Sequence, residues 1–197
     1  MMSEYIVTYI VSHERDLAAV AKNQLEKKWS HDGKIKNYRV ICDLTIGVLG
    51  LGTIGCESRF QLSLSLDNLF HLWVSDYIIS VLPDTDETKG LLTLELFSVV
   101  KSGGIVFMNV GRGSVVSDNN LIAAIESGYI TAAILDVFNS EPLPPDNPLW
   151  SMPQVTITPH TSAVSRAKDI ANVFAENYTA WKTGKPLPDV FQLSRGY

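Results

Sequence analysis

The 197-residue sequence predicts an α/β fold in which helices cover both faces of a doubly wound parallel sheet. Three observations predict this fold. Short apolar runs rich in β-branched residues recur along the chain, and segments with a helical period separate them. The runs also lack the polar alternation of a strand with one wet face, which indicates burial on both faces. We find no internal repeat, low-complexity tract or second domain, so we expect a single domain.

The first predicted element is a helix over residues 3–29, with Ser3 as its cap and apolar residues near a 3.6-residue period. A strand over 45–50 follows after a short connector. It leads directly into Gly50-x-Gly52-x-x-Gly55, the spacing of a dinucleotide-binding turn in a Rossmann-type sheet. A tight strand-to-helix turn with no ligand is the alternative interpretation.

Strands and helices then alternate to the end of the chain. In order, we expect a helix over 65–76, a strand over 77–83, a helix over 88–100, a strand over 104–110, a helix over 118–127, strands over 130–138 and 154–160, and a helix over 165–181. Gly128 ends the helix over 118–127, and Gly184 with Pro186 ends the last helix.

Residues that could bind a ligand or take part in catalysis stand at the ends of four of these strands: Pro83, Asn109 to Gly113, Asp136 with Glu141, and His160. Ligands of parallel sheets bind at the carboxyl ends of the strands, so these residues should meet at one edge. The guanidinium of Arg112 suits a carboxylate, and a carboxylate such as Glu141 orients an imidazole and favours its charged form. A cation and a supported histidine acid are what reduction of a 2-keto acid by a nicotinamide requires. The plainer alternatives are a loop-capping arginine and a solvated histidine.

Longer stretches around these residues resemble a known family. They are GVLGLGTIG, SDYIISVLPDTDETKGLL, FMNVGRGSVVSDNNLIAAIESG, AAILDVFNSEPLPPDNPLW and VTITPHTSA. From Tyr5 to Tyr197 the chain is similar to the cofactor-binding domain of the D-isomer-specific 2-hydroxyacid dehydrogenases, and most similar to their glyoxylate/hydroxypyruvate reductase branch. The resemblance implies one NAD(P)-binding domain over 1–197. Residues 3–29 would lead into it and contact a dimer partner, and 165–197 would form the C-terminal helix and tail.

The resemblance also implies a role for each matching residue. Arg112 would bind the substrate carboxylate, His160 would be the general acid/base, and Glu141 would be the partner of His160. Asp136 would hold the nicotinamide carboxamide of NAD or NADP. The remaining cofactor contacts would be Gly50, Gly52, Gly55 and the N–H groups of Thr53 and Ile54 around the pyrophosphate, with Pro83, Thr88 and Val110 lining the cofactor slot.

The chain departs from the family pattern in two places. Ser75 follows Gly55 by only 20 positions, whereas a helix and a strand with their connections need roughly 25 to 30 residues. We therefore expect the sheet to lack one strand, together with the acidic residue that would hold the ribose. Asp76 stands at about the expected spacing of ~20 residues but belongs to the next strand, so NAD cannot be told from NADP. The family's N-terminal lid domain is also expected to be absent.

Two functions follow from these observations. The first is NAD(P)H-dependent reduction of a small 2-oxo acid, such as glyoxylate or hydroxypyruvate, to a D-2-hydroxy acid. The second is a truncated, catalytically impaired module that binds a dinucleotide or a dimer partner.

Composition narrows the class of protein. A net charge of −5 gives no support to a nucleic-acid or anionic-membrane partner. The two cysteines, Cys42 and Cys56, form neither a disulfide framework nor a metal site. With no signal peptide or membrane span expected, the sequence indicates a cytoplasmic protein whose partner is a small molecule, with a homodimer as a family expectation.

Overall fold

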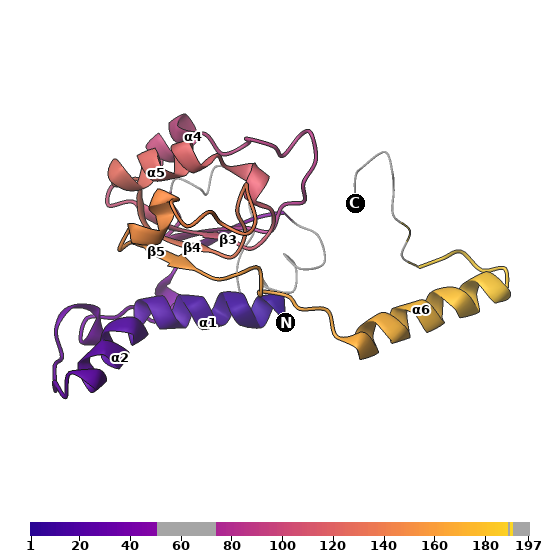
Figure 1. Cartoon of the computed structure of the whole chain (residues 1–197), viewed down its shortest axis with the longest axis horizontal. Coiled ribbons are helices and arrows are strands. Elements are labelled where there is room, and N and C mark those ends of the chain that lie inside the picture. The colour runs from indigo at the N-terminus through magenta and orange to yellow at the C-terminus, as the bar shows by residue number, and fades with distance from the viewer. Residues whose placement is uncertain (51–73, 189, 191–197) are drawn as a thin grey trace.

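A single sheet of five parallel strands, in the order β1-β2-β3-β4-β5, organises the computed structural model, which describes residues 1–50, 74–188 and 190 (Figure 1). The strands are β1 (Ile46–Leu49), β2 (Tyr77–Ser80), β3 (Ile105–Asn109), β4 (Ile130–Leu135) and β5 (Val155–Ile157). All five lie within the segments predicted as strands. The expected loss of a strand between Gly55 and Ser75, and the predicted helix up to residue 73, fall outside the described residues.

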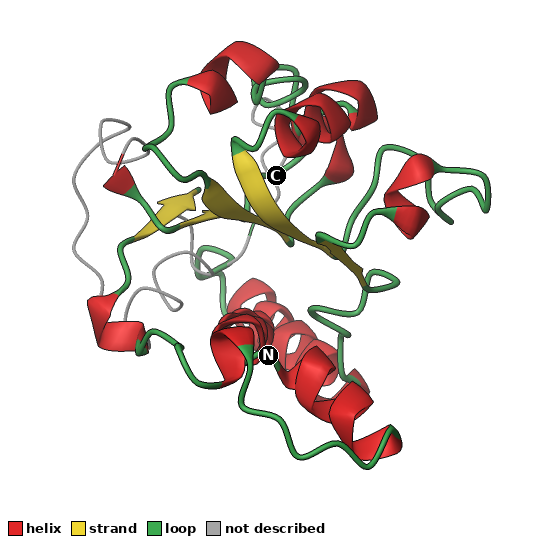
Figure 2. Cartoon of the chain, turned by 90° about the vertical axis from the view of Figure 1, so that its left-hand side faces the viewer, coloured by secondary structure: helices red, strands yellow, loops and turns green. Residues whose placement is uncertain are grey.

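Helices cover both faces of the sheet, which confirms the doubly wound α/β class (Figure 2). Side chains of the central strands point alternately into two apolar clusters. Ile78 and Phe107 belong to the cluster under α4 (Leu94–Ser98) and α5 (Asp118–Glu126). Ile79 and Met108 belong to the cluster under α1 (Met2–Glu14). Burial of β2 and β3 on both faces explains why their sequences are apolar without alternation.

The single helix predicted over 3–29 is wrong, because the structure has two helices there, α1 and α2 (Leu17–Leu25). Asp16 adopts a left-handed backbone with φ 49° between them, and its side chain accepts a hydrogen bond from the Ala19 N–H at the start of α2. Asp16 therefore ends one helix and caps the next. The predicted cap Ser3 instead lies buried inside the first turn of α1.

The helix predicted over 88–100 is also shorter than expected. Thr88 forms part of a turn, where its hydroxyl donates to the Pro83 carbonyl over 2.6 Å. Gly90 then takes a left-handed φ of 63° and donates its N–H to the Ser114 carbonyl. Because this backbone cannot continue a helix, α4 begins only after Thr93, which caps it. The prediction for α5 is confirmed, including its end before Gly128.

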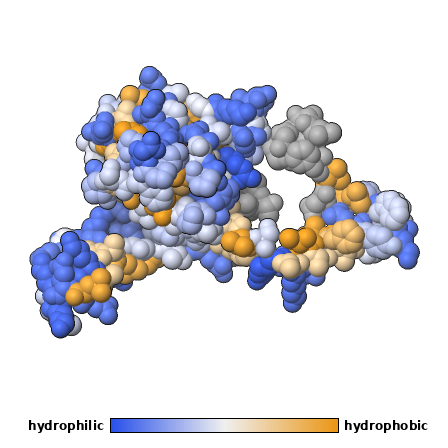
Figure 3. Space-filling model, in the orientation of Figure 1, coloured by the Kyte–Doolittle hydropathy of each residue, from blue (hydrophilic) through white to orange (hydrophobic). Residues whose placement is uncertain are grey.

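The closing helix α6 (Ala167–Lys182) matches its predicted position but extends away from the sheet and buries none of its residues (Figure 1). Its exposed apolar side chains recur at helical spacing along one side, where Figure 3 shows apolar colour. Phe174 stacks on Tyr178, and Tyr178 contacts Trp181 with ring centroids 5.8 Å apart. Short 3-10 helices complete the described structure: η1 (Gly33–Ile35), η2 (Ile41–Asp43), η4 (Gly113–Val115) and η5 (Pro148–Ser151).

An ion-pair network joins α1 to the amino-end edge of the sheet. Arg39 binds both carboxylate oxygens of the buried Glu14, at 2.6 and 3.1 Å, and reaches Asp76 over 2.6 Å. Asp76 also accepts the Thr45 N–H over 2.8 Å and pairs with Lys101. Asp76 thus lies where β1 and β2 begin, at the edge opposite to the strand ends that hold ligands. This confirms that Asp76 is not the acidic residue of the dinucleotide motif.

We predict that His13, next to this network, makes the protein sensitive to mild acid. Burial, followed by the charge of Lys34 at 2.6 Å, lowers the pKa of His13 from 6.5 to about 4. Between these two values the unfolded chain binds a proton that the folded chain excludes, so the free energy of unfolding falls as the pH drops. Replacing His13 with Gln should flatten this fall between pH 7 and pH 5, as measured by urea denaturation.

The exposed His31 provides the control. His31→Gln should keep the acid sensitivity of the wild type. Equal losses of stability for wild type and His13→Gln over this pH range would contradict the assignment.

Candidate active site

The loop after β3 is held between its two neighbours by glycines that no other residue can replace without a clash. A Cβ on Gly111 would lie 2.5 Å from the Leu82 carbonyl oxygen, in the loop after β2. A Cβ on Gly113 would lie 2.0 Å from the Phe138 carbonyl carbon, in the loop after β4. The two glycines therefore let three strand-end loops pack backbone against backbone, with Arg112 between them.

Arg112 is exposed and keeps most of its hydrogen-bonding capacity. One Nη1–H donates to the Gly111 carbonyl over 2.8 Å, and Asn109 Nδ2 binds the Arg112 carbonyl over 3.0 Å. Within residues 1–50 and 74–188, Arg112 forms no ion pair with an acidic side chain. Since a guanidinium has five N–H donors, the remaining donors can bind a small carboxylate.

His160 and Glu141 form the predicted imidazole–carboxylate pair. His160 Nδ1 lies 2.7 Å from Glu141 Oε2, and the side chains are 51% and 34% exposed. Because an ionised carboxylate only accepts hydrogen bonds, Nδ1 carries the proton of this contact. The other Glu141 oxygen accepts the Phe138 N–H over 2.9 Å, which fixes the carboxylate. Within residues 1–50, 74–188 and 190, the second ring nitrogen, Nε2, has no hydrogen-bond partner, so the charged ring can donate a proton to a ligand from it.

Strand register brings the three side chains to one edge of the sheet. Asn109 pairs with Leu135, and Leu135 pairs with Ile157, so β3, β4 and β5 end level with one another. Arg112 follows β3 closely, and His160 follows β5 by the same number of positions. The contact of Gly113 with Phe138 then joins the Arg112 loop to the loop that carries Glu141.

Asp136, the predicted carboxamide ligand, lies beneath this edge with none of its surface exposed. Its carboxylate accepts hydrogen bonds from Thr158 Oγ1 and from the N–H groups of Thr161 and Ser162, each N–H at 2.8 Å. Burial alone would raise the pKa of Asp136, but these bonds, together with one from the Ser162 side chain, lower the pKa below its ordinary value. Asp136 therefore stays ionised.

The predicted cofactor contacts meet the same edge on the β1 and β2 side. Gly50 has φ 103°, and a Cβ there would lie 3.1 Å from Val81 Cγ2, so the end of β1 needs a glycine. Thr88 closes the loop that begins at Pro83, through their hydrogen bond. Val110 buries its side chain in the α1 cluster and donates its N–H to the Ser80 carbonyl, so a ligand contact would fall to its own carbonyl. Gly52, Thr53, Ile54 and Gly55 lie outside the described residues.

Gly50 lies so close to Val81 that a side chain is excluded there, and such a bare strand end is typical of a site where a dinucleotide binds. Among the described residues, no group of three or more His, Cys, Asp or Glu side chains could hold a metal ion. A search over these residues also finds no helix both long and apolar enough to cross a membrane.

Two residues near the site were not anticipated from the sequence, Tyr5 and Thr158. The Tyr5 hydroxyl of α1 contacts Thr158 Oγ1 over 2.7 Å, and Thr158 binds Asp136. Nothing in the periodicity of α1 distinguishes Tyr5 from an ordinary core residue, so this contact needed the structure.

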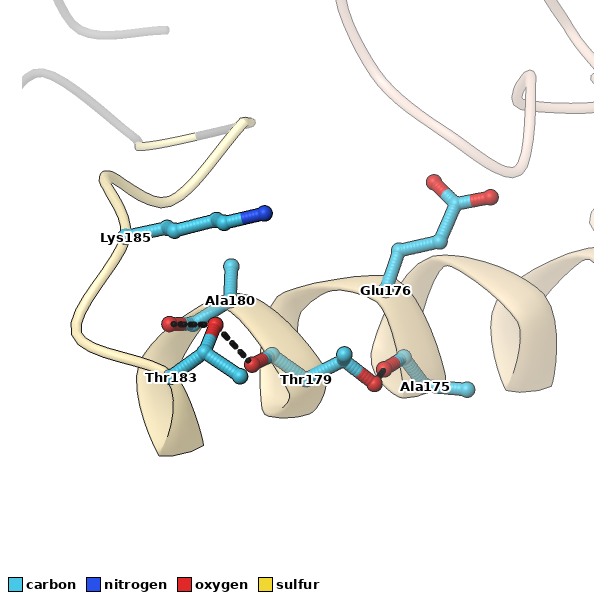
Figure 4. A pocket seen from close by; sticks show the side chains of 6 residues that line it. All are labelled: Ala175, Glu176, Thr179, Ala180, Thr183 and Lys185. Carbon is cyan, nitrogen blue, oxygen red and sulfur yellow. Dashed lines mark hydrogen bonds between the residues drawn. The ribbon is translucent and has the colours of Figure 1, made fainter.

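A shallow hollow lies elsewhere, along the last turns of α6 (Figure 4). Its lining comes from that helix and the residues directly after it, Ala175, Glu176, Thr179, Ala180, Thr183 and Lys185. Thr179 and Thr183 bind helix carbonyls with their hydroxyls, so these groups are already used. The hollow has no part in the strand-end site.

Parallel strands with a histidine–carboxylate pair at their carboxyl edge, and an arginine there that has no acidic partner in the described part of the chain, define a nucleotide-binding α/β domain of the dehydrogenase type. The sequence profile of the D-isomer specific 2-hydroxyacid dehydrogenase NAD binding domain matches residues 56–162, more than half of the chain. The chain belongs to this family.

Individual relatives agree with the family match. Glyoxylate/hydroxypyruvate reductase A of Photorhabdus laumondii is 30% identical over 223 residues, covering all of this chain and 68% of the relative. A probable 2-hydroxyacid dehydrogenase from Rhizobium etli, solved with NADP, HEPES and L(+)-tartaric acid, is 28% identical with a TM-score of 0.87, over the whole chain and 69% of that protein. An NADPH-dependent glyoxylate/hydroxypyruvate reductase from Sinorhizobium meliloti, solved with NADP and sulfate, is 25% identical with a TM-score of 0.88 and the same coverage.

We predict that Gly113→Ala destabilises the protein by more than about 3 kcal/mol, because the added methyl group would overlap the backbone of Phe138. Gly90→Ala is the matched control. Its φ of 63° is unfavourable for alanine, but no atom lies within 4 Å of the new Cβ, so it should cost only about 1 to 2 kcal/mol. Chemical denaturation measures both, and equal losses would contradict the close packing of the loops.

Proposed function

We propose that this chain reduces a small 2-oxo acid to a D-2-hydroxy acid with NADH or NADPH, with glyoxylate or hydroxypyruvate as substrate. The observation that carries the proposal is the 2.7 Å contact between His160 and Glu141 at the edge that also presents Arg112. The relatives support the substrate and cofactor class, since two are named glyoxylate/hydroxypyruvate reductases and two were solved with NADP.

The charged Arg112 would bind the substrate carboxylate through paired hydrogen bonds and so orient the adjacent carbonyl group. His160 Nε2–H would donate its proton to the carbonyl oxygen as negative charge develops there. Glu141 would hold the ring through Nδ1 and so direct Nε2 toward the substrate carbonyl. A reduced nicotinamide, when bound, supplies the hydride that the carbonyl carbon receives.

The dinucleotide would lie against the ends of β1 and β2. Gly50 would allow the close backbone approach, and Pro83 with Thr88 would form the wall of the slot. We extend the same role to Gly52, Thr53, Ile54 and Gly55 from the family pattern alone.

We predict that His160→Asn lowers kcat for glyoxylate reduction by about 10²- to 10⁴-fold, the usual contribution of a general acid. NADPH binding, followed by nicotinamide fluorescence, should change little. The exposed His31 serves as control, and His31→Asn should keep full activity.

Arg112→Lys keeps the positive charge but loses the planar pair of donors. We expect it to raise the KM for glyoxylate by about 10- to 100-fold, the effect of losing a charge-assisted hydrogen bond. Arg166→Lys, in an exposed pair with Asp169 on α6, should leave KM unchanged.

Steady-state absorbance of NADPH measures these variants. A wild-type chain that binds NADPH but shows no glyoxylate- or hydroxypyruvate-dependent oxidation would overturn the reductase proposal in favour of a dinucleotide-binding module.

A further inference from the structure

A chain of hydrogen bonds runs beneath His160 from the first helix to the end of β4. Tyr5 of α1 contacts the hydroxyl of Thr158, and that hydroxyl donates to Asp136. The three residues are far apart in sequence, and Asp136 is fully buried. The chain therefore connects α1, the end of β5 and the end of β4 directly below the candidate active site.

The direction of the bonds follows from the donors and acceptors available. An ionised carboxylate only accepts, so the Thr158 hydrogen points to Asp136, and Thr158 Oγ1 must then accept from Tyr5. Burial raises the pKa of the Tyr5 hydroxyl, so this hydroxyl keeps its hydrogen. Tyr5 thus donates to Thr158, and Thr158 donates to Asp136, so both hydroxyl hydrogens are used.

Asp136 binds the backbone of His160 and of the two residues that follow it. Its own carbonyl accepts the His160 N–H over 3.0 Å, and its carboxylate accepts the N–H groups of Thr161 and Ser162. His160 has φ 52°, a left-handed conformation that is unfavourable for a non-glycine residue. Such a conformation persists only where the surroundings enforce it, and the bonds to Asp136 supply that constraint.

Three hydrogen bonds from the 158–162 loop hold the carboxylate of Asp136. A carboxylate offers about four acceptor positions. Thr158 Oγ1 and the Thr161 N–H bind Oδ1, and the Ser162 N–H binds Oδ2. With none of its surface exposed, Asp136 does not reach the strand-end edge where a cofactor would lie.

We propose that Asp136, Thr158 and Tyr5 are positioning residues for His160, and that Asp136 acts by holding the 158–162 loop. This inference deepens the proposed reductase function and rests on it for its kinetic consequences. The hold on the loop itself is independent of activity, so it can be measured separately.

The decisive variant is Asp136→Asn, which keeps the shape but turns an amide N–H₂ toward donors that need an acceptor. We expect the amide hydrogens of Thr161 and Ser162 to exchange at least about tenfold faster in the free protein, measured by NMR. We also expect kcat to fall by about 10- to 100-fold while the Kd for NADPH changes less than about twofold. Unchanged exchange, or a tenfold weaker Kd with kcat kept, would overturn the proposal.

Thr158 offers a milder test that does not remove a buried charge. Thr158→Val deletes only the hydroxyl and should lower kcat by about tenfold and speed exchange at Thr161. Thr158→Ser restores the hydroxyl and should recover kcat to within about twofold. If Thr158 acted only by packing its methyl group, Thr158→Val would keep kcat and Thr158→Ser would lower it. Thr156→Val, on the exposed part of the same strand, is the control and should change neither quantity.

Tyr5→Phe tests whether α1 contributes. Loss of the hydroxyl should lower kcat by a few-fold, in the same direction as Thr158→Val, with the Kd for NADPH unchanged. Tyr129→Phe, at the opposite end of β4, is the matched control. If the chain proves to have no reductase activity, the amide exchange at Thr161 and Ser162 still decides the positioning role, so the two proposals fail separately.

Discussion

The close packing of backbone at the carboxyl ends of β2, β3 and β4 is the constraint on which the candidate site depends. β3, β4 and β5 end level with one another, and Gly111 and Gly113 let the loop after β3 touch both the loop after β2 and the loop after β4. A side chain at Gly113 would separate the loop that carries Arg112 from the loop that carries Glu141. The placement of the charged groups is therefore a consequence of the sheet and of two missing methyl groups.

The charged side chains at the two edges of the sheet differ in their partners. At the amino edge, acidic and basic side chains neutralise each other, as the contacts of Arg39 with Glu14 and Asp76 show. At the carboxyl edge, the described residues provide neither an acidic partner for the guanidinium of Arg112 nor a hydrogen-bond partner for the Nε2 atom of His160. The uncompensated groups mark the edge where a charged ligand adds binding energy, because they lose no partner when it binds.

Much of the fold was predictable from the sequence because strands buried on both faces leave long apolar runs, as in residues 77–80 and 105–109. The pairing of Glu141 with His160 was also predictable, since parallel strands gather their ends at one edge. Helix ends were less so. The break at Asp16 and the late start of α4 depend on single left-handed residues that a hydrophobic period does not reveal.

The surroundings of Asp136 were beyond sequence analysis for a similar reason. Its acceptor positions are filled by groups more than 20 positions later and, through Thr158, by a tyrosine of the first helix. The sequence pattern around a strand-end carboxylate does not distinguish one that faces a ligand from one that supports a loop. Only the burial and the bonds of Asp136 separate these two roles.

The position of the proton on the His160 ring tests the proposed proton transfer most directly, because the transfer requires Nδ1 to be held by Glu141 and Nε2 to face the ligand. Long-range ¹H–¹⁵N correlation spectra of the free protein report it. We expect the neutral ring to carry its proton on Nδ1, and Glu141→Ala to give a mixture of the two tautomers. A neutral ring protonated on Nε2 in the wild type, or one unaffected by loss of Glu141, would contradict the proposed proton transfer.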